Sequence, residues 1–293
     1  MKLHRYIIIL LMAVALLAGC AERKVVVENH IIVSIAPLKP LVESILGDDF
    51  EVEVLVPHGT SPETFSPPPK QLQRVESARL VFGTGLLDFE QQLLHRIARR
   101  EQIVDLSQGI ELIAGTCSHA HKHSAECQHS HHSHAHGIDP HIWCSPKSLA
   151  TMAENTFKAI KFSMPDSTKY EERYTTLCIK LLELDEEVSE RCRQATRSHF
   201  VIYHPALTYL ARDYALTQIA IEHEGKEPSA KRLAEVIRLC REEGVKHILY
   251  QSEFPASSVE ILCHDTGAKA VEINPLAEDI FTNISNIVTL ITE

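Results

Sequence analysis

The chain has 293 residues, of which 44% are hydrophobic and 23% are charged, and its formal net charge is −10 at pH 7. This length is sufficient for two domains with separate cores. The acidic balance argues against nucleic acid as a partner and suits a cation, and the eight cysteines, which form no CxxC pair, do not indicate a disulfide framework.

The amino terminus has the pattern of a signal peptide, which we place at residues 1–19. Lys2 and Arg5 precede the apolar run "IIILLMAVALLA", which is too short for an ordinary membrane span, and "LAGC" ends the segment at Cys20. This ending resembles a bacterial lipobox, so we expect Cys20 to carry a lipid and residues 20–29 to form a linker. The prediction is an extracytoplasmic, membrane-anchored protein. A secretory signal that is cut elsewhere is the alternative.

Apolar, strand-like runs then alternate with amphipathic segments. The first half of the chain predicts strands at 30–37, 51–57, 78–85 and 102–106 and helices at 38–47, 70–76 and 89–100. Strands that alternate with helices favour βα units and a mainly parallel sheet.

A histidine-rich segment follows at residues 117–136, and its low complexity predicts a loop without a packed core. Neutral imidazoles select borderline metals such as zinc. One hypothesis is therefore an accessory metal collector of low affinity, and the alternative is a tolerated insertion without function. Its eight candidate ligands are His119, His121, His123, His129, His131, His132, His134 and His136.

A helical linker is predicted at residues 146–196, beginning with Ser145 as N-cap and Pro146 at the first helical position. Its second helix, at 166–193, would span roughly 40 Å and could brace two domains. The remaining chain predicts strands at 199–205, 216–222, 245–251 and 268–273 and helices at 205–213, 229–243, 256–266 and 277–291.

The predicted fold class is therefore α/β, with two βα lobes of mainly parallel sheets bridged by one long helix. The lobes are placed at residues 30–145 and 197–293, with a metal cleft between them. Ligands of such sheets bind outside the carboxyl ends of the strands. Four loops at those ends carry Glu63, His141, His204 and Asn274, which we predict as metal ligands. Each residue could instead be a packed, capping or turn residue.

Several motifs resemble those of ABC-transporter substrate-binding proteins, particularly the zinc and manganese receptors. They are "VEVLVPHGTSPETFSPPPKQLQRVESARLVFGTGLLDFE", "DPHIWCSP", "YHPALTYLARDYAL", "IEHEGKEPSAKRLAEVI" and "TGAKAVEINPL", in the order expected of that family. The resemblance implies two lobes bridged by a long helix, a bound divalent cation and an ABC permease as partner. It also implies a histidine-rich loop before the second ligand.

The resemblance implies that His141 and His204 are the second and third ligands. The first ligand is usually a histidine, where this chain has Glu63, and the fourth is usually acidic, where it has Asn274. Two imidazoles and a carboxylate suit Zn²⁺, and the extra carboxylate admits Mn²⁺ or Fe²⁺. His58 is a further candidate in the first ligand's loop.

The leading prediction is thus a binding protein rather than an enzyme: a monomer that captures a divalent cation, with zinc as the first candidate, for a permease. A zinc-dependent hydrolase using Glu63, His141 and His204 is the first alternative. No HExxH motif supports it, and "HEGKE" at 223–227 lacks the second histidine. An adhesin or metal-storage lipoprotein is the second alternative.

Overall fold

The computed structural model describes residues 29–97, 99–115, 137–164, 168–222, 226–254 and 257–293. The predicted signal peptide (1–19), the predicted lipidation site Cys20 and the histidine-rich segment (117–136) lie outside the described residues.

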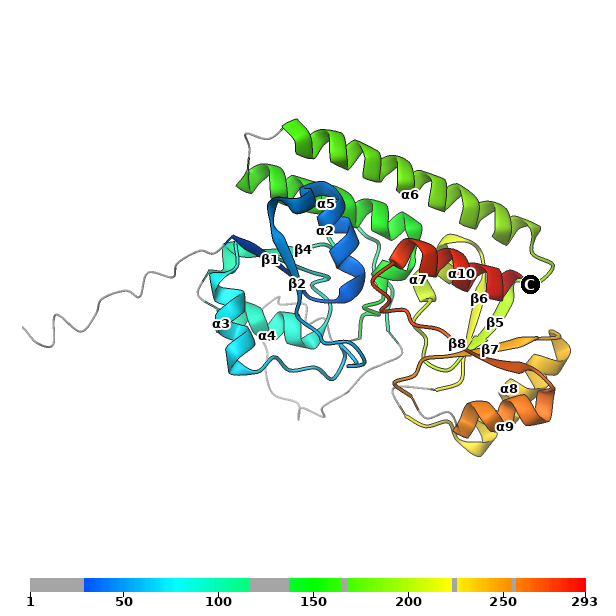
Figure 1. The fold of residues 1–293 in the computed structure, drawn as a ribbon. Helices are drawn as coiled ribbons and strands as arrows, with labels where there is room; N and C mark the ends of the chain where they lie inside the picture. The colour runs from blue at the N-terminus through cyan, green and yellow to red at the C-terminus, as the bar shows by residue number, and fades with distance from the viewer. Residues whose placement is uncertain (1–28, 98, 116–136, 165–167, 223–225, 255–256) are drawn as a thin grey trace, which may run out of the picture.

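The first half of the chain forms a four-stranded sheet with the order β2-β1-β3-β4, in which all neighbouring strands are parallel (Figure 1). Its elements are β1 (His30–Val33), η1 (Ala36–Leu38), α2 (Lys39–Leu46), η2 (Gly47–Asp49), β2 (Glu51–Val54), α3 (Pro69–Ser77), β3 (Leu80–Gly83), α4 (Asp88–Arg96), η3 (Arg100–Gln102) and β4 (Ile103–Asp105). The central strands β1 and β3 are buried along their whole length. Continuous apolar runs such as "LVFG" suit this position because both faces of a parallel sheet are covered by helices.

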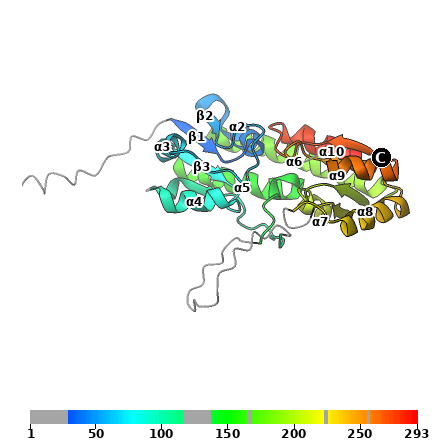
Figure 2. The same cartoon turned by 90° about the horizontal axis from the view of Figure 1, so that it is seen from below.

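The second sheet repeats this arrangement, with the order β6-β5-β7-β8 and parallel pairing throughout. Its elements are β5 (His199–Ile202), α7 (Thr208–Asp213), β6 (Thr217–Ala220), α8 (Ala230–Glu242), β7 (His247–Tyr250), α9 (Ser257–Thr266), β8 (Lys269–Glu272) and α10 (Ile280–Thr292). Seen from below, α3 and α4 lie at one end of the molecule and α8 and α9 at the other (Figure 2).

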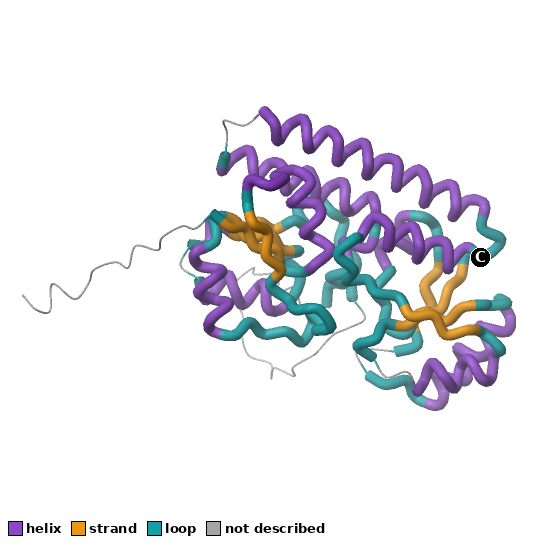
Figure 3. Tube along the Cα trace, viewed as in Figure 1, coloured by secondary structure: helices purple, strands orange, loops and turns teal. Residues whose placement is uncertain are grey.

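Two long helices connect the sheets, α5 (Pro146–Ser163) and α6 (Thr168–Gln194), with η4 (Ile142–Cys144) preceding them. The 27 residues of α6 would span roughly 40 Å. This helix packs on α5, on α2 beside the first sheet and on α10 beside the second, so it bridges the two halves (Figures 1 and 3). The buried positions are Tyr170, Leu177, Leu181, Leu184 and Val188. The predicted fold class, with two parallel βα lobes and a bridging helix, is confirmed.

One hydrophobic core runs through both halves. It joins Phe82 of the first sheet to Trp143, to Leu181 of α6 and to Phe200 of the second sheet. A smaller cluster, which includes Val236, lies between the second sheet and the helices α8 and α9. Because the two sheets share a core, the loops between them are held on a common support. The lobe boundaries at residues 145 and 197 stay a prediction.

Two local predictions differ from the structure. The helix predicted at 89–100 ends at Arg96, because Ile97 turns to an extended conformation (φ −97°, ψ 145°) and buries its side chain. Helix α5 begins at Pro146 as predicted, but the Ser145 hydroxyl does not cap it. That hydroxyl donates to the carboxylate of Asp213, which ties the start of α5 to the end of α7.

Among the described residues, the structure has no helix that combines the length and the apolar character needed to cross a membrane.

Candidate metal centre

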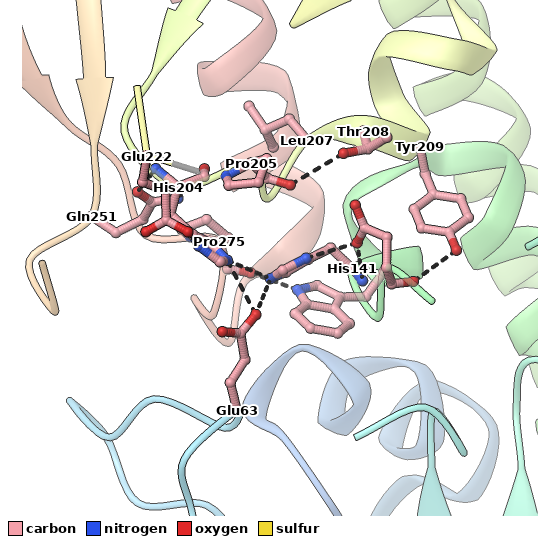
Figure 4. A network of polar contacts seen from close by, with 12 residues as sticks. Glu63, His141, His204, Pro205, Leu207, Thr208, Tyr209, Glu222, Gln251 and Pro275 are labelled. Carbon is pink, nitrogen blue, oxygen red and sulfur yellow. Dashed lines mark hydrogen bonds and ion pairs between the residues drawn. The ribbon is translucent and has the colours of Figure 1, made fainter. Parts of the chain in front are cut away.

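Three of the predicted ligands meet between the two sheets. Glu63 lies in the loop between β2 and α3, His141 directly precedes η4, and His204 follows β5. The Glu63 carboxylate points from its loop toward both imidazoles (Figure 4). Glu63 Oε1 lies 3.2 Å from His204 Nε2 and 3.8 Å from His141 Nε2, and the two Nε2 atoms are 3.4 Å apart.

This spacing fits a small metal ion. With Zn–N and Zn–O bonds of 2.0–2.1 Å, the ligand atoms of a tetrahedral site are separated by roughly 3.3 Å. Among the described residues, Glu63, His141 and His204 are the one group of three or more histidine, cysteine, aspartate or glutamate side chains able to hold a metal. The donor set of two imidazoles and one carboxylate can therefore hold a divalent metal at this position.

Two buried carboxylates hold the imidazoles from behind. Asp139 Oδ1 lies 2.8 Å from His141 Nδ1, and Glu222 Oε1 lies 3.0 Å from His204 Nδ1. In each pair Nδ1–H donates to the carboxylate, which leaves Nε2 directed toward Glu63. This arrangement fixes the ring orientation and makes each Nε2 a stronger ligand.

The charges in the site support one another. Burial by itself would lower the pKa of His204, but hydrogen bonds to Glu222 and Glu63 and the charges of these groups raise it to about 9. Burial would likewise raise the pKa of Glu63, yet its hydrogen bond to His204 and the charges of both histidines hold it below its usual value. The pKa of Asp139 is lowered by the His141 ring and its backbone N–H, again against the effect of burial. Without metal, His204 is therefore a cation between two carboxylates.

The surrounding structure restrains the segment that carries His141. The fully buried Trp143 donates from Nε1 to the carbonyl of Pro275, at 2.9 Å, which joins this segment to the loop after β8. The Tyr209 hydroxyl donates to the carbonyl of Asp139 at 2.8 Å and accepts from the N–H of Ile113 at 3.2 Å. These bonds come from different elements, so the imidazole position is set by the fold.

A small cavity adjoins the three donors. It has a volume of about 30 Å³, which is room for one ion with little water. Its lining also includes Trp143, Gln251, Glu253, Phe254 and Leu276.

Asn274 and His58 are not part of this cluster. Both line a neighbouring cavity of about 140 Å³. The Asn274 side chain is turned back on its own loop, where Oδ1 accepts from the N–H of Leu276 at 2.9 Å. The predicted ligand set is thus brought together at three of its four positions. The eight histidines of the segment 117–136 lie outside the described residues.

Sequence reasoning missed the carboxylate behind His204. Glu222 follows the carboxyl end of β6, which is the same type of position that identified the other site residues. The strand-end rule could therefore have found it. Asp139 stood within the "DPHIW" motif but was not assigned a role.

The geometry of the three-residue metal centre agrees with the family and the relatives that the chain resembles. The model of the family "zinc-uptake complex component A periplasmic" matches residues 31–291. The zinc-binding protein AdcA of Streptococcus pyogenes serotype M3 is 28% identical over 271 residues, which cover 87% of this chain and 51% of AdcA. The zinc-binding lipoprotein AdcA of Streptococcus pneumoniae is 26% identical over 272 residues, covering 91% of this chain and 54% of that protein. The chain thus spans about half the length of these two relatives.

The fold has a matching solved structure. The crystal structure of a zinc-bound ZnuA deletion mutant has a TM-score of 0.78 and 30% identity, and the match covers 90% of this chain and 96% of that one. The matched family is a component of an uptake complex and not a class of enzymes, so the prediction of a binding protein over a hydrolase is confirmed. The chain belongs to the family of zinc-uptake complex component A proteins.

Proposed function

We propose that this chain captures Zn²⁺ outside the cytoplasm and delivers it to the membrane subunits of an ABC importer. The observation that carries the proposal is the spacing of the Glu63, His141 and His204 donor atoms, 3.2–3.8 Å, inside a buried cleft. The ion undergoes no chemical reaction. The site therefore needs only metal ligands and a shape that excludes other metal ions.

Zinc is the favoured cargo because of the ligand types and their spacing. Imidazole nitrogen suits zinc better than magnesium, calcium or manganese, which prefer oxygen donors. An octahedral magnesium ion with bonds of 2.0–2.1 Å would separate neighbouring ligands by only roughly 2.9 Å. The tetrahedral value of roughly 3.3 Å is nearer to the measured separations.

The matched family supports the partners and the location that we propose. Relatives described as a periplasmic uptake component and as a zinc-binding lipoprotein support a permease as partner and a lipid anchor at Cys20. The histidine-rich segment 117–136 would act as an accessory collector, since a tethered second binding module raises the local metal concentration. The mature chain would work as a monomer, with lobes at 30–145 and 197–293 joined by the linker 146–196.

Elemental analysis combined with competitive zinc titration tests this proposal. A chain without residues 119–136 is compared with the same chain carrying His141→Ala or His204→Ala. We expect one tightly bound zinc per chain, lost in both single variants, while circular dichroism shows that each variant remains folded. Zinc bound only when the segment is present would overturn the cleft as the receptor site.

A further inference from the structure

The segment after β7 encloses His204 from two sides. Gln251 Nε2 donates to the His204 carbonyl at 3.0 Å, and Gln251 Oε1 accepts from the His204 N–H at 3.4 Å. The Phe254 ring stacks on the imidazole, with centroids 4.8 Å apart and an interplanar angle of 15°. Between them a turn closes from the N–H of Phe254 to the carbonyl of Gln251, at 3.1 Å. Glu253 therefore sits in a turn that is anchored to a metal ligand.

Glu253 lines two adjoining cavities. One is the small cavity at the donor atoms of Glu63, His141 and His204, and the other is the larger cavity that also contains His58. The side chain is partly buried, and within the part of the chain that the structure describes its carboxylate has no hydrogen-bond or ion-pair partner. Space on both sides leaves the three rotatable bonds of this side chain free to turn.

The neighbouring amide is not comparably free. Asn274 Oδ1 accepts from the N–H of Leu276 at 2.9 Å, and its carbonyl accepts from Asn283 Nδ2 at 2.9 Å. Moving Asn274 toward the cluster would break the first of these bonds and could offer only a neutral oxygen. Apart from Glu63, the carboxylate that lines the cavity at the three donors, among the described residues, is Glu253 of the loop after β7.

We infer that Glu253 is the fourth metal ligand, brought in by rotation of its side chain when the ion enters. This inference rests on the proposed function, because it assigns a ligand to the same site. In the structure Glu253 is not part of the three-residue group, so binding requires this rotation. Its carboxylate would join that of Glu63 on the ion. The ligand set would be two imidazoles and two carboxylates.

The test uses the full chain, freed of metal, with the zinc affinity of the tightest site measured against a chromophoric chelator. Glu253→Gln removes the charge at constant size, Glu253→Asp keeps the charge on a shorter side chain, and Asn274→Ser removes the amide. Losing an outer-shell partner alone weakens metal affinity by about 10–100-fold, so we expect Glu253→Gln to weaken zinc binding by at least about tenfold. We expect Glu253→Asp to lose nearly as much and Asn274→Ser to match the unaltered chain.

A spectroscopic measurement separates ligation from a structural effect. One equivalent of cobalt(II) is added to the same proteins, and its visible absorption should change in Glu253→Gln but not in Asn274→Ser. Wild-type affinity in Glu253→Gln would overturn the inference, and so would wild-type affinity in Glu253→Asp, since a carboxylate that acts through its field tolerates a shorter stem. His141→Ala is measured alongside. If His141→Ala binds zinc normally, the proposed function itself fails. If His141→Ala loses zinc binding while Glu253→Gln keeps it, only the assignment of Glu253 is overturned.

Discussion

The affinity for zinc should depend steeply on pH, because the metal replaces a proton on His204. Hydrogen bonds to Glu222 and Glu63 and their charges outweigh the effect of burial and raise the pKa of His204 to about 9. In the metal-free chain near pH 7 this imidazole is protonated at the nitrogen that must bind the ion. Zinc binding therefore releases a proton, and raising the pH removes the competitor.

The expected size follows from the distance between the pH and this pKa. At pH 7, two units below the pKa, about 1% of the molecules have a neutral His204, so the apparent affinity is roughly 100-fold below its limit. At pH 8 the deficit falls to roughly tenfold. The dissociation constant should thus decrease by about tenfold for each pH unit from 6 to 8 and level off near pH 9. An unperturbed histidine would give a nearly flat line above pH 7.

Competition with a chelator of known proton affinities, at pH 6, 7 and 8, measures this slope. Calorimetry in buffers with different ionisation enthalpies counts the protons released, and we expect about one from His204 at pH 7. Glu222→Gln is the matched control, because it removes one carboxylate that raises the pKa of His204 and should flatten the slope above pH 7. A dissociation constant that is the same at pH 6 and 8, with no proton released, would refute the reasoning.

Three further outcomes are expected. In the metal-free chain the pKa of His204 is higher in the folded state than its unfolded value of 6.5. The contribution of His204 to stability should therefore be complete below pH 6.5 and lost as the pH rises through 9. Denaturant titrations across this range measure that contribution, and a stability that rises over the same range would contradict the prediction. Trp143→Phe should lower the free energy of unfolding by about 1–3 kcal/mol, because it leaves the Pro275 carbonyl without its donor; thermal unfolding would show no change if that bond contributes nothing. Leu181→Ala, at a position only 2% exposed, should cost about 2–5 kcal/mol, and chemical unfolding of this variant tests whether α6 is an integral part of the core.

The strand ends and the family resemblance together carried the prediction of the site. His204 could be identified because it stands at the end of a short apolar strand, and His141 because it stands in the connection that follows another. The carboxyl ends of parallel strands lie at one edge of a sheet, where ligands bind. Asn274 follows β8 in the same way, yet its side chain completes a turn within its own loop. Whether a polar residue at a strand end faces the cleft or its own backbone depends on the turn, which periodicity does not describe.

The helices show the same limit. The spacing of apolar residues predicted a long helix at 166–193, and α6 ends within one residue of that range. The same spacing predicts one apolar face made of Tyr170, Tyr174, Cys178, Leu181, Val188 and Cys192. Of these, Tyr170, Leu181 and Val188 are buried, whereas Tyr174, Cys178 and Cys192 are half-buried, and Leu177 and Leu184 complete the buried face. Leu177 and Leu184 each lie three or four residues from Leu181, so the spacing also permitted these two positions. Which positions faced inward was decided by packing on three other helices, α2, α5 and α10.

The two departures from the family's ligand pattern compensate for each other. The resemblance implies a histidine at the first position and an acid at the fourth, and this chain has Glu63 and Asn274 there. The number of carboxylates at these positions is unchanged, but the charge has moved from the loop after β8 to the loop after β2. Glu63 contacts His204 across the cleft at 3.2 Å. This ion pair links the two halves of the molecule before any metal binds. Under the assignment proposed above, Glu253 of the loop after β7 adds a second carboxylate ligand to the site.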